Sequence, residues 1–215
     1  MRGLIARLFG LSAGAPPSAP PTLEEIAASD DFALKQRWLA QLLAEFGWPG
    51  EKVWLSPKRE SCDFLAERFV PEGEALPQGT IEVYYDPAMT YARMGCCLAH
   101  EIQHLKFFAL RDAYLIEPPD GPLHGRFAEF TPQLLASRGG VSKYSCDHWS
   151  AWRGAALPEL FADEMAIGGS EPINETIADV AKAFYNWGRE VNIDPVWRKL
   201  CLAIDDEYAR LTRGV

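Results

Sequence analysis

The chain has 215 residues, of which 48% are hydrophobic and 24% charged, as in a globular protein with a substantial core. Its formal net charge is −9, from 30 acidic and 21 basic residues. An acidic surface repels phosphate backbones, so the composition argues against a nucleic-acid partner and weakly favours basic or neutral substrates.

The first residues of the chain do not have the pattern of a targeting signal. Arg7 interrupts the short apolar stretch at 1–10, whereas a secretory signal needs a continuous one. Residues 12–21 are small and proline-rich, which predicts a flexible linker. We therefore expect a flexible segment at 1–21, a single domain at 22–215, and no transmembrane segment. A cytoplasmic location is expected, with secretion by a non-classical route as the alternative.

Hydrophobic periodicity predicts the elements that follow. A helix is expected at 31–46, then a short strand at 53–55 and a helix at 60–69. The best strand is 80–85, whose sequence TIEVYY is rich in β-branched and aromatic residues, and a long helix follows it at about 89–115. Residues 119–141 read as loop. The remaining expected helices are 144–153, 158–167, 173–187 and 195–212. The pattern predicts an α+β fold, mostly helical with a small sheet.

The long helix contains the sequence His100-Glu101-Ile102-Gln103-His104, an HExxH motif. Residues four apart share one helix face, about 5–6 Å apart between Cβ atoms, so both imidazoles can bind one zinc ion. Glu101 lies about 100° around the helix, close enough to accept a proton from a water molecule on the metal. The motif therefore predicts a zinc site with Glu101 as catalytic base.

The strand, the turn and the HExxH helix together resemble the zincin metallopeptidases. The resemblance implies that 80–85 is the edge strand of the sheet, along which an extended substrate would pair. It does not extend to the metzincin branch. That branch requires glycine and histidine where this chain has Phe107 and Leu110.

A catalytic zinc site needs a third protein ligand. The gluzincin branch uses a glutamate followed four residues later by a carboxylate that orients a ligand histidine. The pattern ExxAD occurs twice, with Glu175 and Asp179 and with Glu159 and Asp163. We favour Glu175 with Asp179, because PINETIAD is similar to the ligand segment of thermolysin-like enzymes. Glu159 is the rival. His124 and His148 are the remaining alternatives.

The segment Val141-Ser142-Lys143-Tyr144-Ser145 resembles one in toxin-like and phage-encoded gluzincins, where the tyrosine hydroxyl faces the site. On that resemblance Tyr144 is the candidate donor to the oxyanion that amide hydrolysis creates. A tyrosine that only packs its ring at a helix start is the structural alternative.

The sequence thus predicts a zinc metallopeptidase of the gluzincin type that acts on a peptide or protein substrate. Two alternatives stay open. One is a non-catalytic binding or structural protein of zincin fold, for instance in a phage or toxin system. The other is a zinc hydrolase of a non-peptide amide, which would use the same chemistry.

Overall fold

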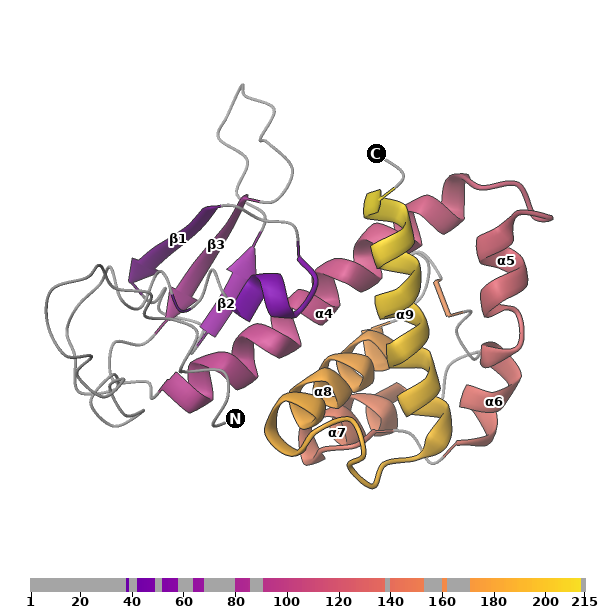
Figure 1. Ribbon diagram of the computed structural model, residues 1–215. Helices are drawn as coiled ribbons and strands as arrows, with labels where there is room; N and C mark the ends of the chain where they lie inside the picture. The colour runs from indigo at the N-terminus through magenta and orange to yellow at the C-terminus, as the bar shows by residue number, and fades with distance from the viewer. Residues whose placement is uncertain are drawn as a thin grey trace, which may run out of the picture.

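The computed structural model describes residues 38, 42–48, 52–57, 64–67, 80–85, 91–137, 140–152, 160–161 and 171–213 (Figure 1). The segment predicted to be flexible, 1–21, lies outside them, as do most of the helices predicted at 31–46 and 158–167.

Helices make up most of the described chain (Figure 1). The long helix that carries the HExxH motif is α4, and it is followed by two short and three longer helices. The helices are α4 (Tyr91–Ile116), α5 (Pro122–Phe127), α6 (Phe130–Ala136), α7 (Lys143–Trp152), α8 (Glu171–Trp187) and α9 (Pro195–Arg213).

The helix boundaries follow from local chemistry. Helix α4 ends just before Pro118, as expected because a proline disfavours helical geometry in the residue before it. Helix α8 ends at Trp187, and the next residue, Gly188, has a φ of 81° that suits glycine. Helix α9 begins after Asp194, whose Oδ1 accepts a hydrogen bond from the backbone N–H of Val196 at 3.0 Å.

The prediction of loop at 119–141 is wrong in its middle part, which contains α5 and α6. Both helices are too short to show a hydrophobic period. The start of α5 depends on a side chain from outside it: Glu117 Oε2 accepts hydrogen bonds from the N–H groups of Leu123 at 2.8 Å and His124 at 3.2 Å.

Three strands form one sheet with the order β1-β3-β2. The strands are β1 (Lys52–Pro57), β2 (Phe64–Glu67) and β3 (Thr80–Tyr85). Strand β3 pairs in parallel with β1 along its whole length and antiparallel with β2 from Glu82 to Tyr85. The helix predicted at 60–69 is therefore wrong, since its centre is strand β2.

The fold-class prediction needs correction in two respects. We expected an α+β domain in which an edge strand precedes the HExxH helix, but the described side chains belong to a mainly helical body. In addition, β3 is the central strand of its sheet and has a neighbour on each side. It is therefore not the substrate-pairing edge that the zincin resemblance implied.

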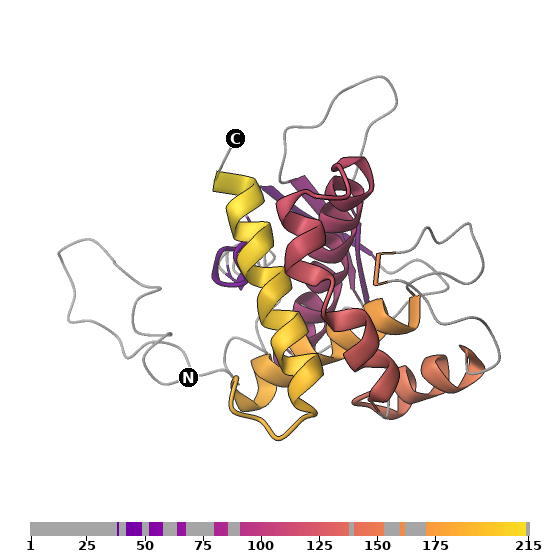
Figure 2. The same ribbon diagram turned by 90° about the vertical axis from the view of Figure 1, so that its right-hand side faces the viewer.

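The core lies where α4 packs against α8 and α9. Apolar side chains recur every three or four residues on each helix, so each presents one apolar face to the others. Figure 2 shows α9 in front, running alongside α5 and α6. The largest fully buried side chains of the described core are those of Trp197, Phe107, Phe161, Leu43, Met94, Leu98, Ile102, Leu110, Leu134 and Ile173.

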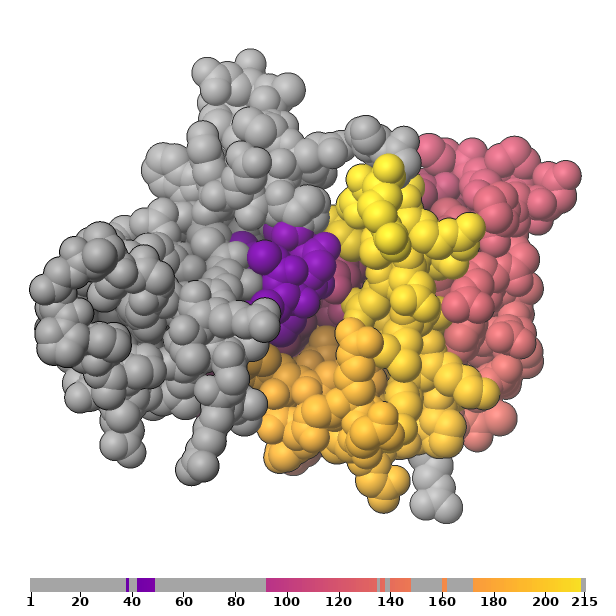
Figure 3. All heavy atoms as spheres, in the orientation of Figure 1, coloured from indigo at the N-terminus to yellow at the C-terminus, as the bar shows by residue number. Residues whose placement is uncertain are grey.

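Residues 42–48 form the end of a helix and contact α9. Gly47 has φ 73°, and the N–H of Trp48 bonds to the carbonyl of Leu43 at 2.9 Å, which closes a Schellman-type cap. The Trp48 ring stacks on Tyr208 of α9 with centroids 5.5 Å apart. Figure 3 shows a hollow between this segment and α9, with α4 exposed in it.

None of the described helices combines the length and the apolar character that crossing a membrane requires.

The close approach of α4 to α8 predicts an opposite response from two glycines. A methyl group at Gly95 in α4 would lie 2.2 Å from the hydroxyl of Tyr185, whereas one at Gly125 in α5 would meet nothing within 4 Å. Alanine stabilises a helix relative to glycine by up to about 1 kcal/mol, whereas an extra methyl group in a packed interface destabilises the fold by roughly 1–3 kcal/mol. We expect Gly95→Ala to lower the free energy of unfolding and Gly125→Ala to raise it slightly in urea titrations. A stabilising Gly95→Ala would contradict this packing.

Candidate metal centre

Two histidines project from one face of α4. His100 and His104 are one helical turn apart, and their side chains are 15% and 13% exposed. Their rings meet edge to face, with centroids 4.6 Å apart and planes at 86°. The two Nε2 atoms are only 3.0 Å apart, so both point at the same small volume.

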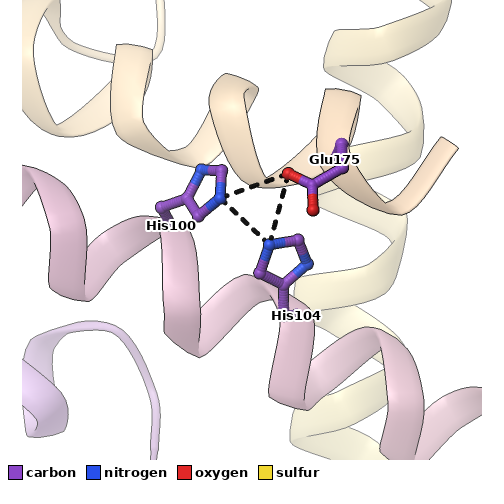
Figure 4. A group of neighbouring side chains, drawn as sticks. All are labelled: His100, His104 and Glu175. Atoms are coloured by element: carbon purple, nitrogen blue, oxygen red, sulfur yellow. Dashed lines mark hydrogen bonds and ion pairs between the residues drawn. The ribbon is translucent and has the colours of Figure 1, made fainter. Parts of the chain in front are cut away.

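Helix α8 brings a carboxylate to that volume. Oε2 of Glu175 lies 3.4 Å from Nε2 of His100 and 3.6 Å from Nε2 of His104 (Figure 4). In Figure 4 both rings turn toward the carboxylate across the gap between the helices. In the described part of the chain, these three residues form the group whose ligand atoms are mutually close enough to hold a metal ion.

The spacing of the three atoms fits a tetrahedral ion. Ligand atoms bound to one zinc ion at about 2.0–2.1 Å lie about 3.3 Å from one another. The separations of 3.0, 3.4 and 3.6 Å bracket that value. Two imidazole nitrogens and one carboxylate oxygen also form a donor set typical of catalytic zinc, which keeps its fourth position for water.

Residues of α8 also lie beside the two rings. Oδ1 of Asp179 lies 3.4 Å from Nδ1 of His100. Asn174, which is 4% exposed and also on α8, opposes the lowering of the His104 pKa. A carboxylate beside Nδ1 can hold the His100 ring with Nε2 directed at the proposed metal position. The structure thus brings the predicted residue Asp179 to the position expected for it. Asn174 has a role that the sequence reasoning missed, although it stands next to Glu175.

The electrostatics of the cluster reflect its burial and its charges. Burial favours neutral His100, but hydrogen bonds with Asp179 and Glu175, helped by the charge of Glu101, outweigh burial and raise its pKa to about 9. Burial and the nearby His100 lower the pKa of His104. The carboxylates therefore make this a site that favours positive charge.

The first turn of α7 completes the surroundings of Asp179. Burial alone would raise the pKa of this carboxyl group, but hydrogen bonds from His100, Ser142 and Ser145 outweigh it and lower the pKa. The hydroxyl of Ser142 donates directly to Asp179 Oδ2. The sequence reasoning quoted this segment only for Tyr144, so it missed both serines. Their place at the start of a predicted helix was the available signal.

Of the two predicted catalytic residues, Glu101 lies beside a candidate ligand on α4, whereas Tyr144 lies on α7. Glu101 follows His100 on α4, is partly buried, and acts electrostatically on that histidine. Tyr144 lies in the first turn of α7 and is 53% exposed. The catalytic role of Tyr144 stays a prediction.

The alternative ligands differ in where they lie relative to the described residues. His124 lies away from the site. It stacks on Tyr114 with ring centroids 3.8 Å apart, and its Nε2 is 3.1 Å from the Tyr114 carbonyl, about 15 Å along α4 from His104. The side chain of His148, and Glu159 with its partner Asp163, lie outside what the structure describes.

A cavity of about 160 Å³ lies on a different face of α4. Its walls include Gln103, Lys106, Phe184 and Asp205, and none of the three metal-facing residues lines it. Ala99, Ile102 and Lys106, which also line the cavity, are turned by roughly 100° or more from His100 around the helix. The cavity is therefore separate from the candidate metal centre.

Comparison with known proteins gives no match to any protein-family model, to any curated protein or to any solved structure. The assignment of the site thus depends on its geometry and on the motif.

The geometry predicts which substitutions abolish metal binding. We expect the wild-type chain to bind Zn²⁺, and His100→Ala or Glu175→Ala to bind it at least about 100-fold more weakly, since loss of a direct ligand exceeds the 10–100-fold effect of outer partners. His124→Ala is the matched control and should bind like wild type. Titration against a competing chelator measures each constant.

The same titration tests the rival ligand. If Glu159→Ala loses Zn²⁺ while Glu175→Ala keeps it, then the third ligand is Glu159 and the triangle described here is not the metal centre. If His124→Ala loses the metal, the assignment of α4 and α8 as the supporting helices is wrong.

Proposed function

We propose that this protein is a zinc-dependent metallopeptidase, in which His100, His104 and Glu175 hold the ion and Glu101 is the general base. The observation that carries the proposal is the triangle of ligand atoms with sides of 3.0, 3.4 and 3.6 Å. An HExxH helix supplies two of its corners, and Glu101 lies beside the first of them.

The donor set supports zinc over other divalent ions. Mg²⁺ and Ca²⁺ prefer six or more oxygen ligands, whereas two imidazoles and one carboxylate suit a tetrahedral borderline-soft ion. Zinc, when bound, polarises a water molecule and the carbonyl group of the substrate.

The residues of the chain supply the general base, the group that orients a ligand and the donor to the oxyanion. Glu101 accepts the proton of the attacking water and later donates it to the leaving amine, which needs a carboxylate that is ionised in the resting enzyme. Asp179 keeps the His100 ring oriented. Tyr144 is the proposed donor to the oxygen that becomes negative during attack.

A peptide or protein is the proposed substrate, because cleavage of an amide bond matches both the base and the ligand set. A non-peptide amide would require the same groups.

The base can be tested without disturbing the metal. We expect Glu101→Gln to lower kcat on a peptide library by about 10²- to 10⁴-fold and to leave zinc affinity nearly unchanged, because Glu101 removes a proton and does not bind the ion. Cleavage is followed by mass spectrometry, and zinc content is measured on the same samples.

Asp112→Asn is the control, since it removes one acidic charge from an exposed part of the same helix. It should retain wild-type activity. Glu101→Gln with full activity would refute the mechanism. A zinc-loaded wild-type chain that cleaves no peptide would favour the binding or structural role, or a non-peptide amide as substrate.

A further inference from the structure

The start of α7 contacts the metal centre through a single carboxylate. Asp179 accepts from the hydroxyl of Ser142 at Oδ2, while its Oδ1 faces Nδ1 of His100 at 3.4 Å. The two oxygens of one side chain thus link the cap of a helix to a proposed metal ligand. Asp179 is 5% exposed, so water has little room to replace either partner.

We propose that Ser142 and Ser145 are positioning residues that couple the docking of α7 to metal binding at His100. This inference rests on the metal centre of the proposed function and does not require that the chain cleave peptides.

The two serines form a reciprocal cap. Ser142 Oγ accepts from the N–H of Ser145 at 3.1 Å, and Ser145 Oγ accepts from the N–H of Ser142 at 3.0 Å and of Val141 at 2.9 Å. This is the arrangement of a capping box, with serine in place of the usual glutamate or glutamine. The α7 cap can therefore form only with both hydroxyls turned inward, and Ser145 is fully buried.

The single hydroxyl proton of Ser142 determines which partner donates in its hydrogen bond with Asp179. A hydroxyl group has one donor and two acceptor positions. Since Ser142 Oγ accepts from the backbone of Ser145, its proton is available for Asp179. The carboxylate is thereby held in one orientation, with its other oxygen toward His100. Rotation of Asp179 would break both contacts at once.

The approach to the cap leaves little freedom to rearrange. Gly140 has φ 57°, and a methyl group there would lie 2.6 Å from the backbone nitrogen of Cys146 in the first turn of α7. The chain therefore enters the helix through a conformation that suits glycine and packs directly on that turn. Movement of the cap relative to α8 would have to shift this whole entry segment.

Coupling between two sites is reciprocal. If docking of α7 orients His100 for the ion, then binding of the ion must stabilise the docked first turn of α7. The link predicts an effect on metal affinity from residues that do not touch the metal, and an effect of the metal on a helix that holds none of the three ligands.

The experiment uses three substitutions of Ser142 in the full-length chain. Ser142→Gly and Ser142→Asp both preserve a good helix cap, yet the first removes the donor and the second places a carboxylate against Asp179. We expect both to weaken Zn²⁺ binding by about 10-fold, the lower end of the range for partners outside the ligand set. Ser142→Thr retains the hydroxyl and should bind within about twofold of wild type.

Thr212→Ala is the matched control, because it removes a helix hydroxyl that bonds to the carbonyl of Tyr208 far from the site in sequence. Its zinc affinity should equal that of wild type. A thermal unfolding scan with chelator present identifies any variant that does not fold. If Ser142→Asp binds Zn²⁺ like wild type, the serine acts only as a cap and the coupling is refuted.

Hydrogen exchange provides a second readout that a purely structural serine would not move. Zn²⁺ should slow exchange of the amides of Ser145 and Cys146 in the wild-type chain, because both bond to Ser142. The slowing should be much smaller in Ser142→Gly. Zinc that protects α4 and α8 but leaves α7 unchanged overturns the coupling alone. A wild-type chain that binds no zinc overturns the metal centre and the coupling together.

Discussion

The packing of α4 against α8 is the constraint on which the site depends. Each helix contributes two functional residues four positions apart: His100 and His104 from one, Glu175 and Asp179 from the other. Four residues span about one helical turn, so each pair lies on a single face. The two faces can meet only if the helix axes approach closely, and Gly95 permits that approach by leaving room for Tyr185.

The candidate site buries charged and polar groups. Glu175 and Asp179 are 14% and 5% exposed, and burial of two carboxylates beside two imidazoles carries a desolvation cost. Hydrogen bonds from Ser142 and His100 offset part of it, as the lowered pKa of Asp179 reflects. A buried polar cluster of this kind is typical of a functional site rather than of a core optimised for packing.

The features predicted correctly from the sequence are those that depend on local geometry. Helix α4 shows a long hydrophobic period, and the HExxH spacing alone places His100 and His104 on one face. The choice of Glu175 over Glu159 rested only on the likeness of PINETIAD to a known ligand segment, because both glutamates stand in ExxAD. The predictions that were wrong concern non-local structure. Strand β2 is stabilised by pairing with β3, and its own residues taken alone predicted a helix. Likewise, the place of β3 in the sheet is set by its two neighbours, and no pattern within 80–85 could reveal it.

The central position of β3 constrains how a peptide could reach the metal centre. From Glu82 to Tyr85 both sides of this strand are occupied by β1 and β2, so a substrate backbone cannot add to it there. Main-chain pairing is the usual way to hold an extended peptide without regard to its side chains. If the chain cleaves peptides as proposed, substrate recognition would depend on other groups, because that route is closed along these residues. Tyr144 is one exposed candidate, since 53% of it is exposed on α7, the helix whose cap contacts Asp179 beside His100.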